Sequence, residues 1–75
     1  MIAQDALAEV FEGERRRLFA LAYRMLGSVS DAEDVVQDAW VRLAAQSPIP
    51  DRPEAWLTTL VGRLCIDRLR RRQRD

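Results

Sequence analysis

Three aspartates are spaced so that they would share one face of a helix. Asp31, Asp34 and Asp38 recur at intervals of three and four residues, and Gln37 lies beside them. Like charges at these spacings repel one another by roughly a few tenths of a kcal/mol per pair. Acids near a helix N-terminus complement its dipole, which explains Asp31 well and Asp38, two turns further on, poorly. Two interpretations stay open: acids that complement the dipole, or a face that binds a basic surface outside the helix.

A second group of side chains with binding chemistry stands at the end of the chain. These are the arginines Arg68, Arg70, Arg71, Arg72 and Arg74. The planar fork of arginine suits phosphate oxygens, and a run of this density exceeds what is needed to complement one helix dipole. The run therefore indicates a nucleic-acid backbone as ligand, with a solvated helix end as the alternative.

A formal charge of zero conceals an uneven distribution of charge along the chain. Residues 1–38 hold eight of the twelve acids and four of the twelve arginines, which gives four minus eight, or −4. Residues 39–75 hold the other four acids and eight arginines, which gives +4. We therefore expect a dipolar molecule, with one end suited to a basic protein surface and the other to a phosphate backbone.

The residues needed for most catalytic and metal chemistry are missing from the sequence. There is no histidine, and there are one cysteine and three glycines. We therefore expect no catalytic residues, no metal, no cofactor and no glycine-rich phosphate loop. Cys65, between Leu64 and Ile66, is expected to be inert apolar filler. Without an apolar run of about 18 residues or a cleavable leader, the chain is expected to be cytoplasmic, not an enzyme, and without membrane contact.

The apolar residues recur with the period of a helix, which predicts an all-α fold in one domain over residues 1–75. The three helices are expected at about 4–26, 31–46 and 53–73. The positions expected to face the core are Leu7, Val10, Phe11, Leu18, Leu21, Ala22, Met25 and Leu26 in the first helix, Val35, Val36, Ala39, Trp40, Leu43 and Ala44 in the second, and Trp56, Leu57, Leu60, Val61, Leu64 and Leu69 in the third. Both tryptophans are expected in the core rather than as stacking platforms.

Turn and cap residues mark the ends of these helices. Gly27 stands where a left-handed C-terminal cap belongs. Ser30 and Glu33 have the spacing of a capping box for the second helix. Pro53 suits the first turn of the third helix, which Asp51 or Arg52 would cap. Three prolines in residues 48–53 predict a stiff loop between the second and third helices.

Three motifs together resemble region 2 of the extracytoplasmic-function sigma factors, a branch of the sigma-70 superfamily of bacterial transcription initiation factors. They are the segments Asp31–Trp40, Ala55–Leu60 and Leu64–Arg70. Their order and spacing, and the proline-containing loop between the first two, match the family over nearly the whole chain. The resemblance implies a three-helix σ2 domain that binds core RNA polymerase and recognises and helps open the promoter −10 element.

The resemblance also implies which residues make each contact. The second helix would dock on the clamp helices of the RNA polymerase β′ subunit through Asp31, Asp34, Gln37 and Asp38. The loop would accept a flipped base of the non-template strand, and arginines of the third helix would hold phosphates. The residues expected to bind promoter DNA are Ser47, Ile49, Pro50, Asp51, Arg52, Thr58, Thr59, Arg63, Arg70 and Arg71.

The chain departs from the family pattern in two respects. Gly62 and Arg63 stand where many members have an Arg-Asn pair, and the surrounding sequence is more similar to a subgroup with a C-terminal domain resembling small polyketide cyclases. No σ4 domain follows Asp75, so the chain is expected to be an excised σ2 domain. An anti-sigma factor and the rest of a longer chain stay open as further partners. The alternative function is a helical protein-interaction module without a DNA role; a helix-turn-helix fits poorly because the proline loop is too long.

Overall fold

The computed structural model describes residues 4–74 and contains three helices. They are α1 (Gln4–Leu26), α2 (Val29–Ala44) and α3 (Pro53–Arg74). No strand occurs within residues 4–74, so the predicted all-α fold is confirmed.

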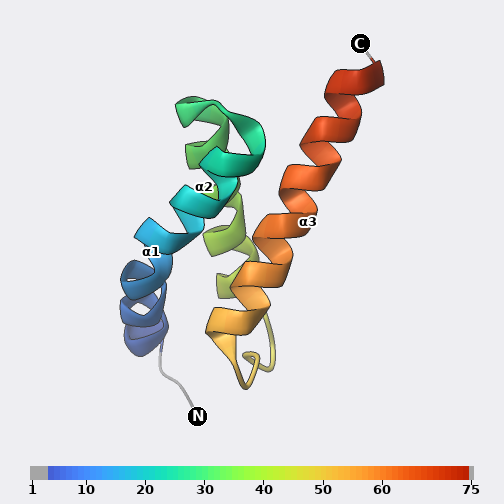
Figure 1. Cartoon of the computed structure of the whole chain (residues 1–75). Helices are drawn as coiled ribbons and strands as arrows, with labels where there is room; N and C mark the ends of the chain where they lie inside the picture. The colour runs from blue at the N-terminus through green and yellow to red at the C-terminus, as the bar shows by residue number, and fades with distance from the viewer. Residues whose placement is uncertain (1–3, 75) are drawn as a thin grey trace.

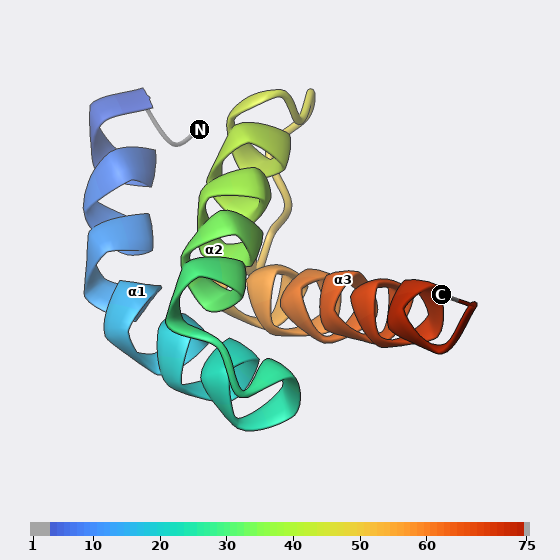
Figure 2. The same ribbon diagram turned by 90° about the horizontal axis from the view of Figure 1, so that it is seen from above.

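The first two helices form an antiparallel hairpin, and the third packs across it (Figure 1). Seen from above, α3 leaves the hairpin at a steep angle, and its C-terminal half extends away from α1 and α2 (Figure 2). The molecule is accordingly elongated, with principal extents of 43 × 21 × 16 Å. This arrangement leaves the arginine-rich end of α3 accessible to a partner on most of its circumference.

Glycine and serine set the short turn between α1 and α2. Gly27 has a φ of 68°, and its N–H donates to the Tyr23 carbonyl at 2.8 Å, as predicted for a left-handed cap. The predicted capping box at Ser30 and Glu33 is wrong, because Ser28 is the N-cap and its hydroxyl accepts from the Asp31 N–H at 3.2 Å. Gly27 reverses the chain within one residue, so the extended cap conformation falls on Ser28 and Ser30 already lies in the first turn.

The bounds of α2 differ from the predicted ones by two residues at each end. The helix begins at Val29 because of the Ser28 cap, and it ends at Ala44, where Ala45 forms the C-cap. The third helix begins at Pro53 as predicted, and the Arg52 carbonyl accepts its first helical hydrogen bond from the Trp56 N–H at 3.0 Å.

All three helices contribute to one apolar core. Its buried residues are Leu7, Phe11, Leu18, Ala22, Leu26, Ala32, Val35, Val36, Ala39, Leu43, Leu57, Val61 and Cys65. Trp40 and Trp56 are partly buried against this core, and the Trp40 ring lies 5.1 Å from that of Phe11. Ala44, expected in the core, is exposed. Burial raises the pKa of the Cys65 thiol, an effect that nearby Arg68 partly opposes, so the side chain is uncharged filler as predicted.

Gly27 and Gly13 should respond in opposite ways to substitution by alanine. Gly27→Ala is expected to lower the free energy of unfolding by about 1 kcal/mol, because an L-residue is strained at this positive φ. Gly13→Ala, in the exposed middle of α1 with no atom near its added methyl group, should raise it by about 0.5–1 kcal/mol. Urea denaturation would check both values. Equal effects of the two changes would contradict the assignment of Gly27 as the cap.

Candidate protein and nucleic-acid interfaces

The four residues predicted to bind polymerase all lie on α2, but they differ in their surroundings. Asp34 and Gln37 are exposed, and the Asp34 side chain is 67% exposed. Asp38 is half-buried, and its carboxylate accepts from Arg42 Nε at 3.1 Å, one turn further along the helix. Asp31 lies in the first turn, where it faces α3 rather than open solvent. Asp34 and Gln37 are thus the two members best placed to meet a partner.

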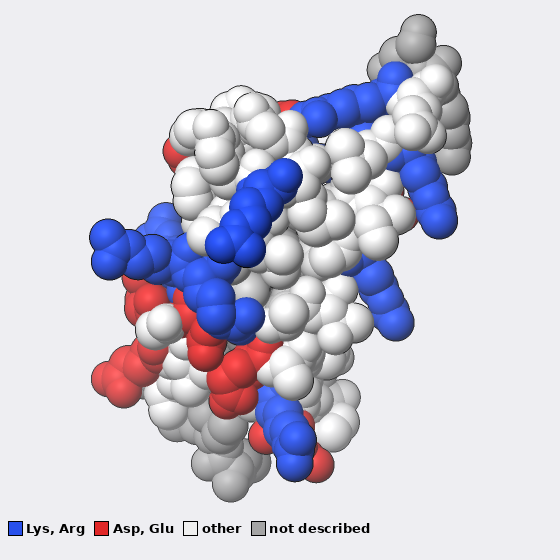
Figure 3. All heavy atoms as spheres, in the orientation of Figure 1, with Lys and Arg blue, Asp and Glu red and all other residues white. Residues whose placement is uncertain are grey.

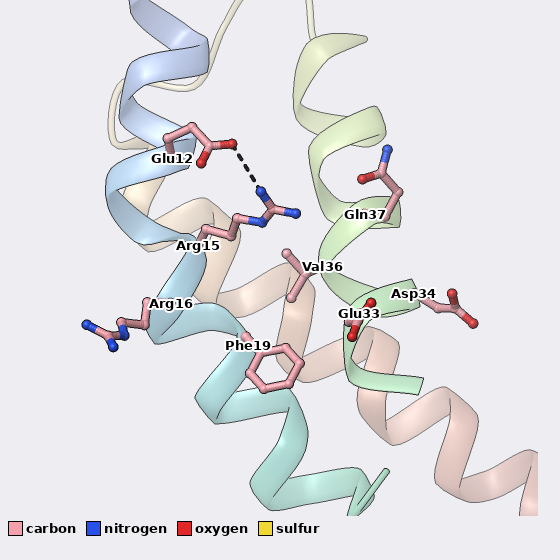
Figure 4. Close-up of a pocket in the computed structure, with 8 residues that line it drawn as sticks. All are labelled: Glu12, Arg15, Arg16, Phe19, Glu33, Asp34, Val36 and Gln37. Carbon is pink, nitrogen blue, oxygen red and sulfur yellow. Dashed lines mark hydrogen bonds and ion pairs between the residues drawn. The ribbon is translucent and has the colours of Figure 1, made fainter. Parts of the chain in front are cut away.

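A groove between α1 and α2 adjoins these residues. It has a volume of about 690 Å³, and its lining residues, which define the α1–α2 groove, are Glu12, Arg15, Arg16, Phe19, Glu33, Asp34, Val36 and Gln37. In Figure 4, Phe19 and Val36 meet at its floor, Arg15 reaches from α1 toward α2, and Asp34 and Gln37 point outward from the far wall. Glu12 accepts a hydrogen bond from Arg15 at 3.5 Å. The groove therefore combines an apolar floor with walls of both charge signs.

The α1 residues of this groove were not predicted as site residues. Arg15, Arg16 and Phe19 were assigned to the first helix on periodicity alone. The arginine cluster at 15–17 is visible in the sequence, but its position opposite Asp34 depends on the packing of α1 against α2. A correct α1–α2 pairing would have been needed to find it.

Positive and negative charge are less separated in space than along the sequence. Asp31 accepts a hydrogen bond from Arg72 Nη2 of α3, and Arg68 Nη1 lies 3.6 Å from the same carboxylate. Arg68 also lies 3.9 Å from Asp34. On the face shown in Figure 3, acidic and basic side chains intermingle over α1, whereas the side chains along α3 are mainly basic. Part of the expected charge separation is therefore neutralised where α3 crosses over the start of α2.

A hollow at the junction of the proline loop and α3 brings five of the predicted DNA-binding residues together. It has a volume of about 640 Å³, and its lining residues, which define the loop hollow, are Pro50, Asp51, Arg52, Ala55, Trp56, Thr59, Leu60 and Arg63. Trp56 and Leu60 supply apolar surface, whereas Asp51, Arg52 and Arg63 supply charge. A planar polar ring could stack on the aromatic side chain and hydrogen-bond to the charged groups.

Five predicted DNA-binding residues do not line this hollow, and three of them lie in the loop or near the start of α3. Ser47 is exposed at the start of the loop, and Ile49 packs partly buried against the core. The Thr58 hydroxyl donates to the Glu54 carbonyl at 2.9 Å and accepts from Arg17 Nη2 of α1 at 2.9 Å. Thr58 therefore contributes to the α1–α3 contact in this structure.

The two remaining residues, Arg70 and Arg71, are exposed on the projecting half of α3. With about 100° of rotation per residue, Arg70 lies about 20° from Arg63 around the helix and about 10 Å further along its axis. Thr59 lies about one turn nearer the start of α3 than Arg63 and about 40° from it around the helix. The loop hollow and Arg70 therefore lie along one stripe of α3, and Arg71 lies about 80° from Arg63, to one side of that stripe.

Residues 4–74 contain no group of three or more His, Cys, Asp and Glu side chains that could hold a metal ion. None of the three described helices is long and apolar enough to cross a membrane.

Comparisons with known proteins identify the family to which this chain is similar. The profile of the family Sigma-70 region 2 matches residues 10–75. The ECF RNA polymerase sigma factor SigJ of Mycobacterium tuberculosis (strain ATCC 25618 / H37Rv) is 50% identical over 60 residues, which cover 80% of this chain and 19% of that protein. The ECF RNA polymerase sigma factor SigW of Bacillus subtilis (strain 168) is 35% identical over 75 residues, 96% of this chain and 40% of that protein.

A third relative is the ECF RNA polymerase sigma factor SigE of Mycolicibacterium smegmatis (strain ATCC 700084 / mc(2)155), 38% identical over 74 residues. These 74 residues cover 96% of this chain and 29% of SigE. The chain therefore spans less than half the length of each of these three relatives. No solved structure gives a significant match. The match over residues 10–75, together with the three-helix fold, places the chain in the sigma-70 region 2 family, in its extracytoplasmic-function branch.

Proposed function

We propose that this chain is the part of a bacterial transcription initiation factor that binds core RNA polymerase and recognises and helps open the promoter −10 element. The observation that carries the proposal is the loop hollow, where Pro50, Asp51, Arg52, Thr59 and Arg63 converge although only the family resemblance linked them to DNA. Membership of the sigma-70 region 2 family and the names of the sequence relatives supply the class of partner.

The α2 face supplies the polymerase contact. Asp34 and Gln37 are exposed beside the α1–α2 groove, and a basic helical surface such as the β′ clamp helices complements their charge and hydrogen-bonding groups. Complementary charge of this kind mainly sets the association rate and the register of docking. Phe19, which is only partly buried in the free chain, would add apolar burial that does not depend on salt.

The loop hollow and the α3 stripe divide the DNA contact between them. The hollow would hold one unstacked base of the non-template strand against Trp56, and unstacking of that base costs on the order of a few kcal/mol. Arg63, Arg70 and Arg71 would bind phosphates, which fixes the position of the strand without reading its sequence. Sequence selection therefore belongs to the loop, and salt-dependent affinity belongs to the arginines.

This division of labour predicts two kinds of DNA-binding defect. Arg71→Ala should lower affinity for single-stranded −10 DNA of any sequence and reduce the log–log salt slope by about 0.7, because one phosphate contact is lost. Pro50→Ala should instead change which base is preferred and leave the slope unchanged, because proline neutralises no phosphate. Fluorescence anisotropy on labelled strands, over a series of salt concentrations, measures both quantities.

The control for this experiment is Arg24→Ala, which removes the same charge from the exposed last turn of α1. It should leave affinity and slope close to those of the parent chain. The parent chain itself should bind a bubble carrying the −10 sequence more tightly than the same sequence as closed duplex. Identical effects of the three substitutions on every sequence would refute the proposed DNA role and favour a protein-interaction module.

A further inference from the structure

One guanidinium group joins the end of α1 to the start of α2. Arg72 Nη1 donates to the Leu26 carbonyl at 3.0 Å, and Arg72 Nη2 donates to the Asp31 carboxylate. Leu26 is the last residue of α1, where carbonyl groups lack a partner within the helix. The planar fork of arginine can bind two acceptors at once, which the single ammonium of lysine cannot do in the same geometry. Arg72 therefore satisfies an acceptor that the helix leaves free.

The site that receives Arg72 is electrostatically negative for two reasons. The C-terminal end of α1 carries the negative end of its dipole, and Asp31 adds a full negative charge. Arg68 lies one turn before Arg72. Its Nη1 atom is 3.6 Å from the Asp31 carboxylate, so it adds a second ion pair at the same acceptor. We name this set, Arg68 and Arg72 with Asp31 and the Leu26 carbonyl, the turn anchor.

Four of the arginines of α3 fall on two roughly opposite faces, and Arg71 lies between these faces. Arg72 is about 180° around the helix from Arg63, whereas Arg70 is about 20° from it. The face that carries Arg68 and Arg72 meets the α1–α2 turn, and the face that carries Arg63 and Arg70 is exposed. Sequence alone groups these residues into one basic run, but the structure gives them different neighbours.

Apolar packing cannot hold the last turn of α3. Leu69 is the last apolar residue of the helix, and it is only partly buried; residues 70–74 are all arginine or glutamine. Within this end of the helix, the turn anchor supplies contacts to the rest of the fold across 41 and 46 residues of sequence. The direction of the projecting half of α3 therefore depends on a polar contact.

We propose that Arg72, supported by Arg68, is a positioning residue that holds the end of α3 against the α1–α2 turn and so fixes where the exposed arginines meet phosphate. Arg72 itself is withheld from DNA, and the main role of Asp31 is to receive it rather than to bind polymerase. The link to DNA rests on the proposed function, but the anchoring of α3 does not.

The anchoring can be tested without DNA, by amide hydrogen exchange on the 75-residue chain. Arg72→Ala should accelerate exchange in the last two turns of α3 by about fivefold, as expected when a partly exposed ion pair is lost. Arg71→Ala is the matched control and should leave these rates unchanged. Adding Asp31→Asn to Arg72→Ala should cause less further acceleration than Asp31→Asn causes alone, because the Arg72–Asp31 contact can be lost only once. Unchanged rates in Arg72→Ala, or fully additive effects, would overturn the turn anchor.

The positioning role can be separated from phosphate binding by the salt dependence of DNA affinity. Arg72→Ala should weaken binding of single-stranded −10 DNA while leaving the salt slope at the parent value, whereas Arg71→Ala reduces the slope by about 0.7. An equal loss of slope in both variants would identify Arg72 as a phosphate ligand and overturn the proposal. If the parent chain binds no DNA, the proposed function fails, and the exchange rates still decide whether Arg72 anchors α3.

Discussion

Replacing Trp40 with alanine is expected to lower the melting temperature of the chain by on the order of 15 °C. Loss of a buried tryptophan side chain costs roughly 3–5 kcal/mol, and the lower value applies to this partly buried ring. In a domain of this size, each kcal/mol shifts the midpoint by roughly 4–8 °C. A chain of 75 residues has about 4–11 kcal/mol of stability in total, so the variant should lose a large fraction of it.

The size of this effect follows from the position of Trp40 between two helices. Its ring lies 5.1 Å from that of Phe11, with 44° between the planes, so it closes the contact of α2 with the first half of α1. Val41→Ala is the matched control, since the adjacent Val41 is 56% exposed and its truncation should hardly move the midpoint. Thermal denaturation followed by circular dichroism compares the two. Nearly equal midpoints for Trp40→Ala and the parent would show that Trp40 belongs to a surface and not to the core.

The elements whose signals are local could be predicted from the sequence. The period of the apolar residues located the three helices, and Gly27 and Pro53 marked their ends correctly because a positive φ and a missing N–H are properties of single residues. The cap of α2 was misplaced because Ser28 and Ser30 each have an acidic residue three positions later. The choice between them depends on how tightly Gly27 turns the chain, which periodicity does not report.

Contacts between distant residues could not be predicted in the same way. The repulsion among Asp31, Asp34 and Asp38 left open whether a charge outside the helix compensates it, and α3 of the same chain supplies part of such a charge through Arg68 and Arg72. The contact between Arg17 and Thr58 likewise joins residues 41 positions apart. Such pairs are set by the angle at which α3 crosses the hairpin, and this angle is a property of the packed core.

Charge reversal at Asp34 is expected to weaken binding to core RNA polymerase by about tenfold to a hundredfold. Asp34→Arg turns an attraction to a basic clamp surface into a repulsion, and removing or opposing one partner of a close charge pair costs roughly 2–5 kcal/mol when the pair is buried in the complex. The lower part of this range applies to a contact at the edge of an interface. Since the Asp34 side chain is 67% exposed in the free chain, the fold should not change.

Two further variants separate this effect from indirect causes. Asp38→Arg reverses charge one turn away on the same face and should also weaken binding, although it removes a 3.1 Å ion pair with Arg42 rather than a contact with α3. Glu9→Arg makes the same change of charge at an exposed position of α1 and should bind like the parent. Helical circular dichroism of each variant checks that the domain is folded.

Equilibrium binding of the fluorescently labelled 75-residue chain to core RNA polymerase, for the parent and Asp34→Arg side by side, tests the central claim most directly. The parent should bind saturably, and Asp34→Arg should need at least tenfold more polymerase for half-saturation while Glu9→Arg follows the parent curve. Absence of saturable binding by the folded parent, or superimposable curves for the parent and Asp34→Arg, would contradict the assignment of the α2 face as the polymerase-binding surface.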